Sequence, residues 1–482
     1  MKYKCKNCGY VYDENVKEIE FSKLSSDYKC PFCESGIEAF EIYEDSVKKY
    51  DKVIKIEASN PSLSFIPEKC TNCGMCKRVC ENIVGIKYDD NKVKRPVCIN
   101  CGQCIINCPT SSLVTKYDYL KVIEYLKKKD TIVTISVAPA IRVSIGDEFD
   151  MPAGSILTQK LVGALKKCGF DYVFDLTYGA DLTIMEEAME LVERINKKEH
   201  LPLFTSCCPS WVKYCEIYHE ELLGNLSSTK SPIMMQGSII NNFFFRNKNN
   251  KKIINVMLAP CTAKKLEIKT NDFKDIDLVI TTRELKYILN ELNIDFNDCD
   301  KCSFDNIMSE GSGAGTIFGT SGGVLQAALR TLYFYLTGKH APSDFLLLEP
   351  LCTFENTKVA NITINDQVYK VASVYGMPAL EKLLEHKDEY LMIEVMNCPN
   401  GCVGGGGQSL INLAHLKETR EKRGLSLYDI DKNQNLRNSY ENPDILRLYS
   451  EFLKYPGSDV AKKYLHTSFN GLHDKFFKKE NN

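Results

Sequence analysis

Apolar residues along most of the chain follow two alternating patterns. Short apolar stretches rich in β-branched residues predict strands at residues 131–141 (TIVTISVAPAI), 172–179, 202–206 and 252–260. Residues 182–198 instead place apolar side chains at helical spacing. This alternation continues to about residue 465 and favours an α/β body with mainly parallel sheets. Ligands in such bodies bind where strands end in loops, so the strand ends are the places to search for a site.

Composition narrows the class of protein. The 482 residues suggest about three domains, and 61 Lys+Arg against 63 Asp+Glu leave no basic surface field that would favour nucleic acid. The chain opens MKYKCKNCGY and contains no run of 18 apolar residues, so we expect neither a secretory leader nor a membrane span. The 22 cysteines therefore indicate a cytoplasmic protein of a reducing compartment whose thiolates bind metal.

The first cysteine group forms two Cys-x-x-Cys knuckles, Cys5/Cys8 and Cys30/Cys33. Four thiolates in this arrangement suit one iron or one zinc ion. The continuation Cys-Gly-Tyr-Val-Tyr-Asp and the Cys-Pro-Phe-Cys half resemble rubredoxin, which implies a mononuclear iron, although the gap between knuckles is shorter and a structural zinc ribbon stays open. We predict a rubredoxin-like domain over 1–45, followed by a charged linker over 46–60.

The second cysteine group repeats the spacing Cys-x2-Cys-x2-Cys-x3-Cys, first over 70–80 and again over 98–108. This is the pattern of bacterial two-cluster ferredoxins, and it predicts a ferredoxin domain of α+β type over 61–125. In such runs three thiolates hold one cubane and the fourth crosses to the other. One [4Fe–4S] cluster is then predicted on Cys70, Cys73, Cys76 and Cys108, and a second on Cys98, Cys101, Cys104 and Cys80.

Five further cysteines stand at predicted strand ends, in Thr-Ser-Cys207-Cys208-Pro, Pro-Cys261-Thr-Ala-Lys and Asn-Cys398-Pro-Asn-Gly-Cys402. A cubane needs four thiolates, so convergence of these loops would leave one cysteine for chemistry. Glycines 404–407 would let backbone approach a bulky inorganic group. The alternative is a set of separate, inert, buried cysteines.

These three segments resemble the signature motifs of iron-only (FeFe) hydrogenases, and the similarity covers roughly residues 65–470. The resemblance implies a two-lobed catalytic body over 126–420 around a buried cluster, and a segment over 421–482 like the hydrogenase small subunit. It implies an H-cluster, that is, a [4Fe–4S] cubane joined to a diiron subsite carrying CO, CN and an azadithiolate. The implied cubane ligands are Cys208, Cys261, Cys398 and Cys402, the last also bridging to the diiron subsite.

The resemblance assigns proton transfer to Cys207, then Glu187, then Ser227, and then Glu190, which is expected at the surface. The thiol pKa lies near enough to ambient pH for proton exchange. Glu187 and Glu190 are three residues apart and share one helix face. From the residues alone, a solvated helix face and an ordinary core serine explain the same pattern.

The resemblance also places other side chains around the subsite. Lys264 would face a cyanide, Glu267 would orient its loop, and the remaining wall residues are Pro139, Phe318 and Met396. Residues 313–319 are expected to form a tight turn that brings Phe318 toward the cluster, and they lack the Gly-Lys-Ser/Thr of a phosphate loop. The chain departs from the family pattern at Ala140, Ala259 and Ile233, which suggests a divergent pocket with altered electronic tuning.

The resemblance implies an anaerobic oxidoreductase that catalyses 2H⁺ + 2e⁻ ⇌ H2. Electrons would enter from a soluble carrier (ferredoxin, flavodoxin or rubredoxin), and maturation proteins would insert the diiron subsite. A hydrogen or redox sensor with the same cofactor is one alternative. A non-catalytic iron–sulfur assembly relative is another, although such relatives tend to lose the thiol, the lysine and the glycine run that this chain keeps. The isolated pair Cys299/Cys302 could be a further metal or dithiol site.

Overall fold

The computed structural model describes residues 1–7, 11–14, 19–31, 34–42, 52–86, 94–246, 251–270, 274–306, 308, 311–343, 345–346, 348–350 and 355–477. These residues form two compact units, residues 1–53 and 54–482. The boundary falls inside the stretch 46–60 predicted as a linker, whereas residues 61–125 pack with the large body. Among the described residues, no helix has the length and apolar character needed to cross a bilayer.

The small unit is a three-stranded antiparallel sheet in the order β2-β1-β3. Its strands are β1 (Lys2–Cys5), β2 (Val11–Asp13) and β3 (Phe40–Ile42). A cluster of aromatic rings fills its interior, with Phe21 stacked on Tyr3 at 4.0 Å between ring centres and Tyr12 packed edge-on against Phe21. Among the described residues of this small unit, Tyr12 and Phe21 are the buried aromatic side chains, and so few buried rings make only a small apolar core.

The large unit begins with the ferredoxin-like segment. Its two short strands pair antiparallel, and each cysteine run contains a short helix. The elements are β4 (Leu63–Phe65), α2 (Met75–Val79), the π-helix Cys80–Val84, α3 (Gln103–Ile106), β5 (Leu113–Thr115) and α4 (Tyr119–Leu126).

The first lobe of the body contains a fully parallel sheet in the order β10-β9-β6-β7. Its elements are β6 (Thr131–Val137), α5 (Thr158–Cys168), β7 (Tyr172–Asp175), α6 (Thr177–Lys197), α8 (Pro232–Ile239), β9 (Lys252–Leu258), α9 (Lys264–Glu267), β10 (Leu278–Ile280) and α10 (Thr282–Glu291). Central strand β6 is almost continuously buried, as a parallel strand covered on both faces requires.

The second lobe contains a mixed sheet in the order β11-β12-β13-β14-β8. β13, β14 and β8 run parallel, whereas β12 runs antiparallel to both of its neighbours, β11 and β13. Its elements are β8 (Leu203–Phe204), α7 (Pro209–Tyr218), α11 (Gly313–Ile317), α12 (Gly323–Thr337), β11 (Glu349–Pro350), β12 (Thr357–Ile364), β13 (Gln367–Tyr375), α13 (Met377–Leu384) and β14 (Met392–Met396).

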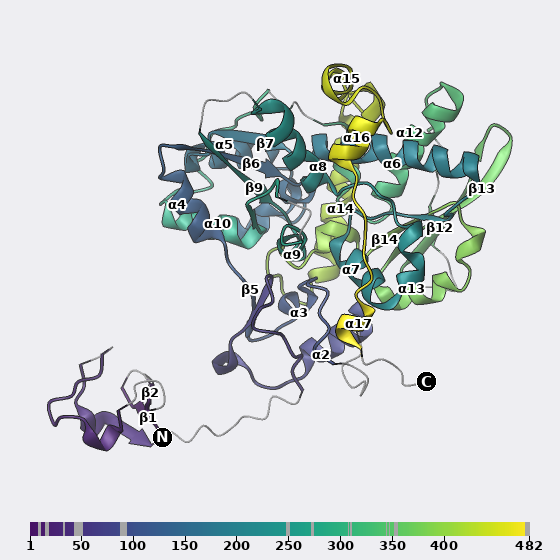
Figure 1. Cartoon of the computed structure of the whole chain (residues 1–482). Helices are drawn as coiled ribbons and strands as arrows, with labels where there is room; N and C mark the ends of the chain where they lie inside the picture. The colour runs from purple at the N-terminus through teal and green to yellow at the C-terminus, as the bar shows by residue number, and fades with distance from the viewer. Residues whose placement is uncertain are drawn as a thin grey trace. The chain divides into compact units, whose positions relative to one another are not determined.

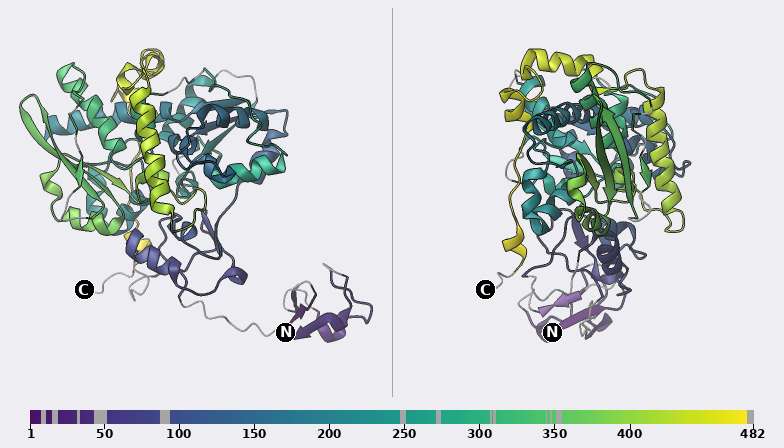
Figure 2. Two further views of the ribbon diagram at one scale, coloured as in Figure 1. Left: turned by 180° about the vertical axis from the view of Figure 1, so that it is seen from behind. Right: turned by 90° about the vertical axis from the view of Figure 1, so that its right-hand side faces the viewer.

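The C-terminal segment joins the parts of the large unit. It comprises α14 (Leu416–Asn433), α15 (Pro443–Leu448), α16 (Asp459–Leu465) and α17 (His473–Phe476). α14 stands between the two lobes (Figure 2). The chain then descends from α16 to α17 (Figure 1), where Arg95 of the cysteine segment stacks on Phe476 at 4.4 Å from the ring centre.

The α/β prediction is confirmed, with three local corrections. The strand predicted over 131–141 ends at Val137, because Pro139 starts a 3-10 helix there. The strand predicted over 172–179 ends at Asp175, and α6 starts at Thr177. The turn predicted over 313–319 is mostly α11, because the Ser312 hydroxyl accepts a hydrogen bond from the Gly315 N–H and caps a helix.

Candidate metal centres and active site

The duplicated cysteine runs adopt the same backbone turn twice. Asn72 and Asn100 have φ angles of 55° and 61°, and Gly74 and Gly102 have φ angles of 75° and 72°. Asn and Gly adopt this left-handed backbone conformation most readily, and it turns backbone N–H groups toward the sulfur of the preceding cysteine. The N–H of Asn72 lies 3.3 Å from the Cys70 sulfur, and that of Asn100 lies 3.4 Å from the Cys98 sulfur. Each turn therefore forms a loop whose backbone is shaped to surround a sulfur.

The electrostatic neighbours of these thiols divide them into two groups. The pKa of Cys101 is raised well above its usual value by burial first, and then by Cys80 and Cys98. The pKa of Cys76 is raised by burial and by Cys108 and Cys73. Cys80 thus lies with the second run and Cys108 with the first, which is the crossed arrangement expected for two cubanes. Cys73 is the exposed member of its group.

Two of the four predicted metal ligands of the small unit are among the described residues. Cys5 ends β1 and Cys30 precedes the turn that returns to Gly36, and both are buried. Cys8 and Cys33 lie outside the described residues. The described half of the predicted metal site is therefore a pair of buried cysteines, and the choice between iron and zinc stays a prediction.

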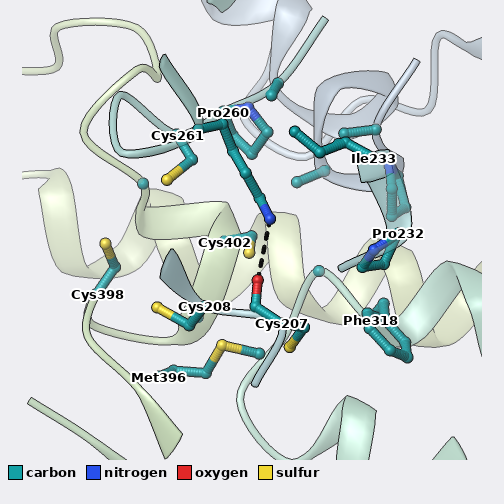
Figure 3. Close-up of a pocket in the computed structure, with 18 of the residues that line it drawn as sticks. Cys207, Cys208, Pro232, Ile233, Pro260, Cys261, Phe318, Met396, Cys398 and Cys402 are labelled. Atoms are coloured by element: carbon teal, nitrogen blue, oxygen red, sulfur yellow. Dashed lines mark hydrogen bonds between the residues drawn. The ribbon is translucent and has the colours of Figure 1, made fainter. Parts of the chain in front are cut away.

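A cavity lies where parallel strands of both sheets end. β6 leads to Pro139, β9 to Cys261 and β14 to Cys398, and the loop after β8 carries Cys207 and Cys208. The sulfurs of Cys208, Cys261, Cys398 and Cys402 face one common space (Figure 3). The Cys207 sulfur lies apart from these four, toward Phe318. Loops that are distant in sequence thus supply four sulfurs around one space and a fifth beside it.

The four converging thiols suit a cluster of metal ions. Burial raises the pKa of Cys261 to about 12, with Cys398 and Cys208 adding repulsion. The pKa values of Cys398 and Cys402 are also raised, first by burial and then by neighbouring thiols. Four thiolates in so small a space would repel one another unless cations neutralised them. No three described His, Cys, Asp or Glu side chains form a site for a single ion, whereas a cubane holds its sulfur ligands further apart.

Local sequence explains why the loops hold their shape. Pro209 starts α7 directly after Cys208, and the indole N–H of Trp211 donates to the Thr205 carbonyl at 3.1 Å. A Cβ on Gly406 would lie 2.2 Å from the Cys101 carbonyl oxygen, and one on Gly405 would lie 2.3 Å from the Pro260 carbonyl oxygen. These glycines are required because other protein loops pack against them, a reason the sequence alone did not reveal.

Lys264 closes one side of the cavity. Its ammonium donates to the Cys207 carbonyl at 3.0 Å and pairs with Glu267 at 2.9 Å. Burial works against protonation, but the Glu267 carboxylate, with Cys261 and Cys207, outweighs it, so the pKa of Lys264 is raised. Lys264 therefore stays charged inside an otherwise apolar wall and can pair with an anionic ligand. Glu267 itself stands outside the cavity and holds the ammonium in place.

The predicted proton-relay residues lie behind Cys207. Glu187 lies on α6, and burial raises its pKa to about 8, with Glu190 adding repulsion. Neither Glu187 oxygen makes a regular hydrogen bond, although the Ser227 hydroxyl is near enough to favour the charged form. Ser227 donates to Glu190 at 3.1 Å. Glu187 also raises the pKa of Cys207, after burial. The four residues thus form a chain of neighbours from the cavity outward.

The outer end of this chain differs from expectation. Glu190 is not a free surface carboxylate, because Arg194 binds it at 2.6 Å and its side chain is only 12% exposed. Ser228 donates to Glu190 at 3.1 Å and contacts His466 at 2.8 Å, and His466 contacts Glu186 at 2.9 Å. Glu190, Ser228 and His466 line an outer cavity that also contains Lys462. Glu190 therefore borders a polar cavity that is built partly by the C-terminal segment.

The remaining predicted residues divide by position. Pro139, Phe318 and Met396 line the active-site cavity, as do all three departures from the family pattern, Ala140, Ile233 and Ala259. Cys299 and Cys302 pack against the core of the first lobe instead, with Cys168. Sequence reasoning missed Asn397, which lines the cavity, and His466, which ends the outer network. Asn397 lies inside a recognised motif, whereas His466 carries no sequence signal.

Comparison with known families agrees with this geometry. Residues 131–406 match the model of the iron-only hydrogenase large subunit, C-terminal domain. The chain belongs to the iron-only hydrogenase family. Residues 417–471 match the iron hydrogenase small subunit, so one chain carries both regions. The family prediction is confirmed, and the hydrogenase small-subunit region begins at the start of α14.

Individual hydrogenases are similar over most of the chain. The NADP-reducing hydrogenase subunit HndD of Solidesulfovibrio fructosivorans is 36% identical over 83% of this chain and 73% of its own length. The structure of a variant of apo [FeFe]-hydrogenase HydA1 from Chlamydomonas reinhardtii matches with a TM-score of 0.66. It is 33% identical and covers 74% of this chain and 99% of its own.

A second group of relatives has a different role. The cytosolic Fe–S cluster assembly factor narfl of Xenopus tropicalis is 27% identical over 80% of this chain and 85% of its own length. The family therefore includes proteins named for cluster assembly. Membership supports an iron–sulfur protein of the oxidoreductase kind, and catalysis must be argued from the site.

Proposed function

We propose that this chain is a hydrogenase that interconverts protons, electrons and H2 reversibly. The observation that carries the proposal is the cavity at the strand ends, where four sulfurs share one space and Cys207 stays apart from them. A cluster-assembly protein needs the four ligands only. Proton transfer would give a role to the separate Cys207 thiol and to the buried Glu187 carboxyl behind it.

The donor set fits an H-cluster. Cys208, Cys261, Cys398 and Cys402 would hold its cubane, Cys402 would also bridge to the diiron subsite, and Lys264 would pair with a cyanide. When bound, the diiron group with its CO, CN and azadithiolate ligands supplies the chemistry that joins protons and electrons. Maturation proteins would have to insert this group.

The protein's own groups would manage the protons. The Cys207 thiol can hold a proton at the cavity wall, and Glu187 can accept it because burial places the pKa of that carboxyl at about 8. Ser227 lies between Glu187 and Glu190 and can pass the proton on, at 3.1 Å from Glu190. The apolar residues Pro139, Ile233 and Phe318 keep the rest of the wall dry.

Electrons would reach the cavity from the other direction. A soluble carrier (ferredoxin, flavodoxin or rubredoxin) would deliver them to the rubredoxin-like iron or to the cluster at the exposed Cys73. The second cluster, held by Cys80, Cys98, Cys101 and Cys104, would pass them to the cubane. The close approach of Gly406 to the Cys101 carbonyl supports this order.

Infrared spectroscopy of the matured protein tests the proposal. We expect CO and CN stretching bands that change when inert gas is replaced by H2, together with H2 release from a reduced dye. Bands that respond to H2 without appreciable turnover would favour a sensor. Absence of bands after maturation, with cubanes present, would favour an assembly role and overturn the proposal.

The divergent wall residues should tune the loaded site. Ala140→Ser adds a hydroxyl donor and Ala259→Met adds bulk, both in the cavity wall. We expect each change, and the double variant more strongly, to shift the CN and CO bands. Ala328→Ser, buried in α12 away from the cavity, is the matched control and should leave the bands in place. Unchanged spectra in all variants would remove the idea of a divergent pocket.

The metal of the small unit can be identified in the full chain. We expect Cys30→Ser to remove a visible ferric–thiolate absorption and a high-spin ferric EPR signal, since one of four thiolates is lost. Cys168→Ser, a buried thiol in α5, should leave both in place. Zinc in the purified protein, with no such absorption in the parent, would instead identify a zinc ribbon.

A further inference from the structure

Asn397 occupies the boundary between the cysteine segment and the active-site cavity. It follows β14 directly, precedes Cys398, and its side chain is fully buried. Its amide nitrogen lies 3.9 Å from the Cys398 sulfur, and the side chain is close enough to Cys101 to lower the pKa of that thiol slightly against the larger effect of burial. Cys101 is a predicted ligand of the second ferredoxin cluster, and Cys398 is a predicted ligand of the H-cluster cubane.

The two backbones on either side are held firmly together. The Gln103 amide donates to the Gly404 carbonyl at 2.9 Å, and the Thr262 hydroxyl donates to the Asn100 carbonyl at 2.7 Å. Cys101 is also the neighbour that most strongly raises the pKa of Cys398, after burial. The two sulfurs are therefore neighbours, and the amide groups of Asn397 and Gln103 lie beside them.

The chemistry of the amide explains its orientation. An asparagine side chain carries two N–H donors and one oxygen acceptor, and metal-bound thiolate sulfurs only accept. The two donors match two sulfurs, whereas the Asn397 oxygen is buried without a hydrogen-bond partner. A buried, unsatisfied oxygen lowers stability, so packing alone gives no reason for an amide at this position.

We propose that Asn397 is a positioning residue that donates hydrogen bonds to one sulfur of each cluster and so sets the reduction potentials across which electrons reach the H-cluster cubane. The inference rests on the proposed function, since it needs both cubanes. Hydrogen bonds to cluster sulfurs stabilise the reduced, more negative state and raise the potential. One electron leaves the cluster bound to Cys101 and one enters the cluster bound to Cys398, and no proton or other reactant is consumed.

The test uses the full chain produced without maturation, which would hold cubanes and no diiron subsite. EPR-monitored redox titrations compare the parent with Asn397→Ala and with Asn397→Leu, which keeps the approximate shape and removes the donors. We expect the reduction potential of each of the two clusters beside Asn397 to fall by about 59 mV. This shift corresponds to about a tenfold change in the equilibrium constant of a one-electron reduction. The cluster that includes Cys73 should not shift and serves as an internal control.

Asn255→Ala is the matched control variant, because Asn255 is a buried amide that bonds to Thr134, Asn241 and Asp275 in the first lobe. It should leave all potentials unchanged. Unchanged potentials in both Asn397 variants, with clusters intact, would overturn the inference. If one of the two Asn397 variants loses its clusters, the potentials of the other variant test the inference. The outcome is separate from the hydrogenase proposal, which is tested by the infrared bands and the H2 turnover of the matured parent.

Discussion

Cys207→Ala is expected to reduce H2 turnover by about 10³-fold while the infrared bands of the bound cofactor remain. Positioned acid–base groups contribute about 10²–10⁴-fold to rates, and Cys207 is the thiol between the cavity and Glu187. It is not one of the four converging sulfurs, so its loss should leave cofactor binding intact. Turnover is measured with a reduced dye, and loading is measured by the CO and CN bands.

Cys215→Ala provides the matched control for this prediction. Cys215 is a fully buried thiol in α7 that donates to the His219 carbonyl, and it does not line the cavity. Its removal should leave turnover within a few-fold of the parent. Full turnover by Cys207→Ala would show that protons reach the cavity by another path. Loss of the bands would show instead that Cys207 is a ligand.

Glu187→Gln is expected to reduce turnover by about 10²-fold or more and to change how stability depends on pH. Glutamine keeps the shape of the side chain but cannot take and release a proton, so transfer from Cys207 to Ser227 stops. Measured turnover should fall in both directions of the reaction, because one relay serves both. The infrared bands should remain, since Glu187 does not line the cavity.

The stability effect follows from the raised pKa of Glu187. Its folded-state pKa is about 8 against an ordinary value of 4.5, so the folded protein holds this proton more tightly than the unfolded chain does. The resulting stabilisation is fully present below about pH 4.5 and is lost as the pH rises to about 8, at most about 5 kcal/mol. The thermal midpoint should therefore fall less between pH 5.5 and pH 8.5 in Glu187→Gln than in the parent.

Glu284→Gln serves as the contrasting control. Glu284 is also fully buried, but Lys265 pairs with it at 3.1 Å and Thr281 donates to it at 3.0 Å. Its neutralisation removes one of the two carboxylates that pair with the buried Lys265 ammonium, the other being Asp118 at 2.8 Å. Stability should therefore fall while the folded protein keeps its turnover. If Glu187→Gln behaved like Glu284→Gln in both assays, Glu187 would be an ordinary structural carboxylate.

Much of the site was predictable because spacing along the chain limits it. Cys70, Cys73 and Cys76 are close in sequence, so local turns alone bring their sulfurs together. The motifs around Cys207, Cys261 and Cys398 were recognisable for the same reason: each is a short loop with its own turn chemistry. The antiparallel part of the second sheet was not predicted, because alternation of strands with helices does not reveal strand direction.

The contacts between distant loops could not be predicted. Glu190 was expected at the surface, yet Arg194 and Ser228 enclose it. The run of glycines was attributed to a cluster, yet Gly406 has no room for a side chain because the Cys101 backbone packs against it. Asn397 stood inside a recognised motif without any assigned role.

The sequence by itself determined the kinds of metal ligand, their grouping within each local run, the alternation of strands and helices, and the family. Only the tertiary structure decided which sulfurs share a space, which buried carboxylate has a raised pKa, and which amide lies beside Cys398 at the edge of the cysteine segment. The physical reason is the separation along the chain over which each kind of interaction acts. Turn geometry and periodicity act between residues a few positions apart, whereas burial, pKa and hydrogen bonding at this site arise from loops brought together by the packing of two sheets.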